Sequence, residues 1–169
     1  MTPKKPRHQL EIKTFRNRHA SDVPTLLNAM EFFLDELLKR CTIAYKLNIK
    51  ITFKGGPLKL DEDATIIDGL AWEHETGTGD KWFHIQLNSD VPFLELLSTL
   101  AHETVHVVQF ATGRLRTTDD DWCWDGKSFG SEPYTGIEEV DNQLPWEYDA
   151  YSKEVELARK FVKQYYSIW

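Results

Sequence analysis

The residues of this chain best suited to chemistry are His102, Glu103 and His106, which form an HExxH run. Residues four positions apart project from the same face of a helix. Two imidazoles at that spacing can bind one zinc ion, and the glutamate between them lies close enough to take a proton from a zinc-bound water. The alternative reading is a pair of core histidines that make ordinary hydrogen bonds.

The segment around this run is expected to form a helix over residues 91–111. Asp90 is a candidate N-cap, Pro92 falls in the first turn, and Gly113 is a stop signal. On a wheel of about 100° per residue, most positions are apolar and one polar sector remains. That sector contains Glu95, Ser98, Thr99, His102, His106 and Gln109, with Glu103 at its border. Two histidines in the polar stripe of a buried helix need partners, and a metal ion would satisfy both.

A third metal ligand must come from elsewhere, since a catalytic zinc ion usually has three protein ligands and one water. No histidine follows His106, so we expect a downstream carboxylate or, as a weaker choice, His74 or His84. The downstream candidates are Glu138, Glu139, Asp141, Glu147 and Asp149. Glu147 is favoured because it lies in the first turn of an expected helix, and rigid elements hold metal geometry better than loops. The alternative is a carboxylate placed there only for the helix dipole.

The elements that must position these residues predict an α+β fold. We expect one domain over residues 10–169, preceded by a flexible tail of residues 1–9. Helices are predicted over residues 22–40, 91–111 and 145–169, and strands over residues 43–54, 65–73 and 81–87. The predicted architecture is a small, mostly antiparallel sheet packed on an N-terminal helix, the central HExxH helix and a C-terminal helix. Residues 113–144 are predicted to form a hairpin or folded flap near the site, because a structureless connection of that length is unusual in a compact domain.

The strand at residues 81–87 alternates, with Trp82, His84 and Gln86 facing one way and the apolar residues between them facing the other. A strand beside the HExxH helix could be the sheet edge that pairs with an extended peptide. An ordinary sheet strand with a surface His84 explains the pattern equally well.

Composition excludes several classes of function. The net charge of −7 argues against general nucleic-acid binding. The basic residues of the tail, Lys4, Lys5 and Arg7, are expected to be solvated. No apolar run is long enough for a membrane span, and the start lacks the apolar core of a secretory signal. Cys41 and Cys123 are too few for a disulfide framework or a Cys₄ zinc site, so we expect free thiols and a cytoplasmic protein, in the host cytoplasm if the gene is carried by a phage.

The pairing of LAHETVHVVQF with PWEYDAYSKE resembles the gluzincin class of zinc metallopeptidases. The similarity is greatest to small phage and bacterial metallopeptidases described as SprT-like and to minigluzincins, and it covers roughly residues 81–160. In that class one helix supplies HExxH and a second supplies a downstream glutamate, so the resemblance implies zinc ligands His102, His106 and Glu147. The chain departs from SprT-type proteins in lacking a third downstream histidine and a cysteine-rich zinc ribbon, so their role in DNA repair does not carry over.

The expected function is therefore zinc-dependent hydrolysis of a peptide or protein substrate, with Glu103 as the catalytic proton acceptor. Tyr134, Tyr148, Tyr151 and Arg114 are candidates to stabilise the oxyanion, and Asp149 is a candidate to orient a ligand histidine. Two alternatives remain: a zinc hydrolase of a non-peptide or cell-wall amide, and a catalytically silent zinc-containing binding module.

Overall fold

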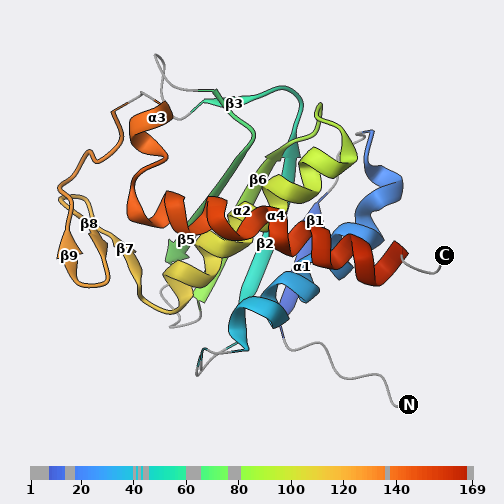
Figure 1. The fold of residues 1–169 in the computed structure, drawn as a ribbon, viewed down its shortest axis with the longest axis horizontal. Helices are drawn as coiled ribbons and strands as arrows, with labels where there is room; N and C mark the ends of the chain where they lie inside the picture. Colours follow the sequence, from blue (N-terminus) through green and yellow to red (C-terminus); the bar gives the residue numbers. More distant parts are fainter. Residues whose placement is uncertain are drawn as a thin grey trace.

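The computed structural model describes residues 8–13, 18–39, 41, 43, 46–59, 66–75, 81–135 and 138–166. These residues form a mixed α/β fold in which helices lie across one face of a four-stranded sheet (Figure 1). The predicted mixture of helices and strands in one fold is confirmed. Residues 1–7, most of the predicted tail, lie outside the described residues.

The main sheet has the strand order β1-β2-β6-β5. Its strands are β1 (Gln9–Lys13), β2 (Asn48–Lys54), β5 (Gly69–Glu75) and β6 (Lys81–Asn88). β1 pairs with β2 and β2 with β6 in parallel, and only β5 runs antiparallel to its neighbour β6. The prediction of a mostly antiparallel sheet is therefore wrong for the sheet that carries the core.

This error arises at strand β1, because the sequence predicted no strand over residues 10–13 and Gln9 fell in the predicted tail. Parallel neighbours need a crossover connection, and here the helix α1 (Val23–Leu38) lies in the chain between β1 and β2. The exposure of the strand alternates, but the strand has five residues, and Leu10 and Ile12 are its two apolar positions. An alternation this short is a weak signal in the sequence. Its place in the sheet depends on pairing with residues almost 40 positions away, as in the register of Gln9 with Asn48.

The strand β6 occupies an interior position between β2 and β5, so it cannot be the free edge suggested for an extended peptide. Its alternation is confirmed, with Phe83, Ile85 and Leu87 buried and Trp82, His84 and Gln86 partly exposed. The antiparallel β5 forms the end of the described sheet on the side of α2 (Phe93–Ala111).

The helix α2 runs through the middle of the core. Every residue from Leu100 to Ala111 is buried, as expected for a helix that is apolar on most of its circumference. Its N-cap is Pro92 and not Asp90, and no side chain caps this end. Its C-terminal end is confirmed: Gly113 has a φ of 73° and its N–H donates to the carbonyl of Phe110, which is the left-handed ending that glycine adopts without steric cost.

The remaining elements frame the core. They are the short 3₁₀ helix Ala20–Asp22, the strand pair β3 (Leu58–Lys59) and β4 (Ile66–Ile67), the three-stranded sheet β7 (Leu115–Thr117), β8 (Trp122–Trp124) and β9 (Lys127–Ser128), and the helices α3 (Glu138–Asp141) and α4 (Pro145–Tyr166). The hairpin predicted within residues 113–144 is thus confirmed. Both cysteines are free.

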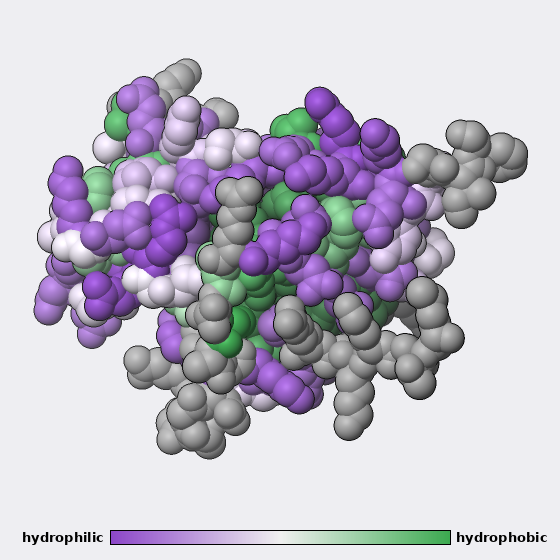
Figure 2. Space-filling model, turned by 60° about the horizontal axis from the view of Figure 1, so that its bottom comes forward, coloured by the Kyte–Doolittle hydropathy of each residue, from purple (hydrophilic) through white to green (hydrophobic). Residues whose placement is uncertain are grey.

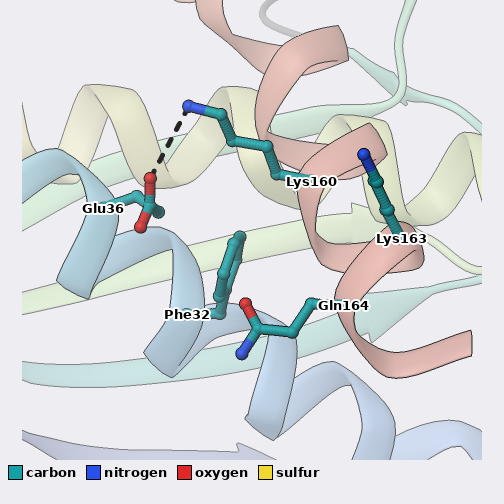
Figure 3. Close-up of a pocket in the computed structure, with 5 residues that line it drawn as sticks. All are labelled: Phe32, Glu36, Lys160, Lys163 and Gln164. Carbon is teal, nitrogen blue, oxygen red and sulfur yellow. Dashed lines mark ion pairs between the residues drawn. The ribbon is translucent and has the colours of Figure 1, made fainter. Parts of the chain in front are cut away.

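One hollow of the surface is lined by residues other than those of the HExxH cluster. A shallow hollow between α1 and α4 is lined by Phe32, Glu36, Lys160, Lys163 and Gln164 (Figure 3). Its one carboxylate, Glu36, pairs with Lys160 at 3.6 Å, so the hollow contains no unneutralised ligand cluster.

Polar side chains dominate the surface seen from below the view of Figure 1, with hydrophobic residues gathered toward its centre (Figure 2). Among the described residues, no helix combines the length and the apolar character that crossing a membrane requires.

Candidate metal centre

The HExxH histidines of α2 face the first turn of α4. The Nε2 atoms of His102 and His106 lie 3.1 Å apart. The Oε2 atom of Glu147 lies 3.2 Å from Nε2 of His102 and 3.4 Å from Nε2 of His106. Among the described residues, these three are the one group of histidine, cysteine or carboxylate side chains that could hold a metal ion. The favoured third ligand, Glu147, is thus brought to the two histidines.

The second nitrogen of His102 is held by a carboxylate. Nδ1 of His102 donates to Oε2 of Glu154 at 2.7 Å. This bond places the proton on Nδ1, so that Nε2 can offer its lone pair toward Glu147 and His106 when the ring is neutral. Glu154 lies seven residues after Glu147, about two helical turns, so both carboxylates project from the same side of α4. Helical periodicity from Glu147 would have found Glu154, which the sequence analysis missed.

The second nitrogen of His106 is held by an amide instead. Nδ1 of His106 donates to Oε1 of Gln109 at 2.9 Å. The amide nitrogen of Gln109 donates to the carbonyl of Trp146 and to Oδ2 of Asp149, both at 3.0 Å. Asp149 is therefore linked to His106 through Gln109, so the orienting role considered for it would be indirect. Outer partners of this kind fix the tautomer and ring orientation of ligand histidines.

The second oxygen of Glu147 is held by the segment between the two helices. The hydroxyl of Tyr134 donates to Oε1 of Glu147 at 2.5 Å and accepts from the indole N–H of Trp146 at 2.8 Å. Trp146 is fully buried and stacks on Trp122 of β8, with ring centroids 5.4 Å apart. The prediction that residues 113–144 lie near the site is confirmed, and this segment helps to position the carboxylate of Glu147.

Glu103 lies on α2 between the two histidines and beside β5. Its side chain is buried, at 5% exposure. A Cβ atom added to Gly69 of β5 would lie 2.6 Å from Oε1 of Glu103 and 2.6 Å from Cγ2 of Thr99. Glycine is therefore required at this close approach, and the sheet edge passes directly over the carboxylate.

The electrostatics of the cluster couple its four ionisable groups. Burial raises the pKa of Glu103, although the two histidines act against this. Burial alone would lower the pKa of His102, but hydrogen bonds to Glu147 and Glu154 outweigh it and raise that pKa to about 10. Burial would also raise the pKa of Glu147, but the neighbouring histidines and Tyr134 lower it well below its usual value. Without a metal ion, attraction between the two histidines and Glu147 favours the charged forms of all three groups.

The other ligand candidates lie elsewhere. His74 and His84 lie on β5 and β6 and form an aromatic cluster with Trp72, whose ring centroid is 4.2 Å from that of His84. Asp141 accepts a hydrogen bond from the backbone N–H of Thr135 at 2.7 Å. The side chains of Glu138 and Glu139 lie outside the described residues.

The four residues considered for stabilising the oxyanion differ in the contacts that they make. Tyr134 is bound to Glu147. Arg114 pairs with Asp125 at 3.1 Å and with Asp149 at 3.6 Å, and its guanidinium lies over the ring of Trp124. Tyr148 is 69% exposed, and the ring of Tyr151 packs edge-on against His102 with centroids 4.6 Å apart. Tyr151 is the one of the four candidates whose ring packs on a candidate ligand.

The chain was compared with protein-family models, with curated proteins and with solved structures, and no match was found.

If zinc is the ion that this cluster binds, replacing Glu154 with alanine is expected to weaken its binding by about 10- to 100-fold, the usual effect of losing an orienting partner. The His102 ring would lose the carboxylate that fixes its Nδ1 proton. Competition with a chromogenic chelator measures the dissociation constant. Glu156→Ala is the matched control, because Glu156 lies two positions further along α4 and its side chain is 66% exposed. Equal affinities in the two variants would contradict the role of Glu154.

If the cluster is a catalytic zinc site, replacing Gly69 with alanine is expected to lower kcat by about 10-fold or more with zinc content unchanged, because the added methyl group would displace Glu103 and none of the three candidate ligands. Steady-state kinetics and metal analysis of the same preparation test both halves of this expectation. Leu70→Ala is the control, since Leu70 points to the opposite face of β5. If kcat is unchanged in Gly69→Ala, the close approach of β5 to Glu103 does not matter for catalysis.

Proposed function

We propose that this chain is a zinc-dependent metallopeptidase of gluzincin type, with His102, His106 and Glu147 as ligands and Glu103 as proton acceptor. The spacing of the three donor atoms carries this proposal. A tetrahedral zinc ion with bonds of about 2.0–2.1 Å holds its ligand atoms about 3.3 Å apart. The three donor separations here are 3.1, 3.2 and 3.4 Å, so the ligand triangle is already of the required size.

The donor set and its surroundings support zinc. Two imidazoles and one carboxylate are a ligand set of known catalytic zinc sites, which leave the fourth position for water or substrate. Each ligand also has an outer partner: Glu154 for His102, Gln109 for His106 and Tyr134 for Glu147. Such support is typical of a site evolved to bind metal, and here it extends to the carboxylate of Glu147 as well as to the two histidines.

The proposed reaction assigns separate chemical roles to the zinc ion and to Glu103. A bound zinc ion would supply a Lewis acid that polarises the scissile carbonyl and lowers the pKa of water toward about 7. Glu103 would accept a proton from the attacking water and release it to the leaving amine as the C–N bond breaks.

The position of β5 favours a peptide over a small substrate. In the described sheet β5 has a neighbour only on the side of β6, and it passes Glu103 at Gly69. An extended peptide paired with the outer side of β5 would run past the proton acceptor. This assigns to β5 the role that the sequence analysis considered for residues 81–87.

The experiment that tests this function combines metal analysis with a peptide-library digest. We expect about one zinc ion per chain, cleavage of a subset of peptides, loss of cleavage after chelation, and recovery on adding zinc. Mass spectrometry identifies the cleaved bonds. Cleavage that survives complete removal of the metal would contradict the proposal, and so would a fully zinc-loaded protein that leaves every peptide intact.

A further inference from the structure

The outward face of α4 carries an unexpected set of apolar side chains. Tyr148, Tyr151 and Val155, here called the α4 stripe, are 69%, 44% and 52% exposed. Their spacing of three and four residues places them on one face of the helix. The opposite face is buried in the core through Trp146, Ala150, Leu157 and Phe161. The outer face of a surface helix is ordinarily polar, so this stripe calls for a partner.

The α4 stripe begins at the candidate metal centre. The ring of Tyr151 packs edge-on against the ring of His102, at 4.6 Å between centroids. On a helical wheel of about 100° per residue, Glu147 and Glu154 fall between the buried face of α4 and this stripe. A molecule that lies over the ligands therefore has the core on one side and the tyrosines on the other.

The chemistry of the stripe favours a side chain of a polypeptide as its occupant. Tyrosine offers a large contact area at a low entropic cost, because few torsions must be fixed. The neighbouring carboxylate of Glu154 is engaged by His102, so it offers little to a positively charged side chain. Burying an apolar side chain on such a surface stabilises the bound peptide, so the surface favours peptides that carry such a side chain.

We infer that the α4 stripe is a specificity site that binds an aromatic or aliphatic side chain of the polypeptide substrate close to the cleaved bond. This inference rests on the proposed function. It adds to that function the class of side chain that the substrate must carry and the residues of this chain that bind it. Tyr148 and Val155 are binding residues in this assignment, and they do not take part in the reaction.

The test uses the zinc-loaded full chain and two peptides taken from the library digest. The peptides differ at one position near the cleaved bond, with phenylalanine in one and serine in the other. We expect the wild type to prefer the phenylalanine peptide by about 10-fold or more in kcat/KM. Tyr148→Ser and Val155→Ser should each reduce this preference by raising KM for the phenylalanine peptide.

The control is Tyr166→Ser, at the far end of α4, where the side chain is 52% exposed like that of Val155. Its preference should equal that of the wild type. Hydrolysis without discrimination between the peptides would overturn this inference alone, as would equal losses for both peptides or a preference for lysine at that position. Concentration-dependent dimers lost in Tyr148→Ser would also overturn it, by identifying a second copy as the occupant. Absence of zinc-dependent hydrolysis in the wild type would overturn the proposed function and this inference together.

Discussion

Glu103→Gln is expected to lower kcat by roughly 10²- to 10⁴-fold, the range associated with losing a general base, while the zinc content stays unchanged. An amide cannot accept the proton of the attacking water, but it has nearly the volume of the carboxyl group. It should therefore keep the packing of residue 103 against Gly69 and Thr99. Steady-state kinetics on a cleaved peptide and metal analysis of the same sample give the two measurements.

Glu95→Gln is the matched control for this variant, because Glu95 lies two helical turns before Glu103 on α2 but is exposed. It should retain wild-type kcat. The unfolding midpoint of metal-free Glu103→Gln should not fall, since burial disfavours the charged form of Glu103 and raises its pKa. Full activity in Glu103→Gln would remove Glu103 from the mechanism and leave zinc binding untouched.

Glu147→Ala is expected to lose most of the bound zinc, by more than the 10- to 100-fold expected for an orienting residue such as Glu154. The substitution removes the carboxylate that contacts both Nε2 atoms. It also removes the acceptor for the Tyr134 hydroxyl. Zinc stoichiometry after dialysis and a competition titration measure the effect.

The informative result is a graded order of zinc affinity, with Glu147→Ala weakest, Glu154→Ala intermediate and Glu156→Ala equal to the wild type. The geometry supports this order, because Oε2 of Glu147 lies within 3.4 Å of both Nε2 atoms, whereas Glu154 contacts Nδ1 of His102. If the zinc content of Glu147→Ala is unchanged, the third ligand is another group.

The candidate site was predictable where it depends on local periodicity. The HExxH spacing places His102 and His106 on one face of α2, and the wheel placed them in the polar stripe of a buried helix. The search for a later carboxylate led to Glu147. Periodicity applied once more to α4 would have added Glu154, and the polar sector of α2 already contained Gln109 without a role.

The fold was less predictable because it depends on pairing between distant residues. β1 has five residues and a weak pattern, and its parallel pairing with β2 follows from the crossover through α1. The same limit applies to Tyr134: its sequence context says nothing of a hydrogen bond to Glu147, which arises only when Trp122 and Trp146 stack and bring the segment onto α4.

The helices α2 and α4 contribute all three candidate ligands and are separated along the chain by the β7–β9 segment, so the cluster exists only once the two helices have docked. An ion that binds this cluster and not the unfolded chain adds to folding stability, by about 2.7 kcal/mol when its free concentration is a hundred times its dissociation constant. The amount of folded protein in a cell would then follow the cell's supply of the metal. Starvation for that metal would then increase proteolysis of the unfolded chain as well as remove the activity of the folded protein.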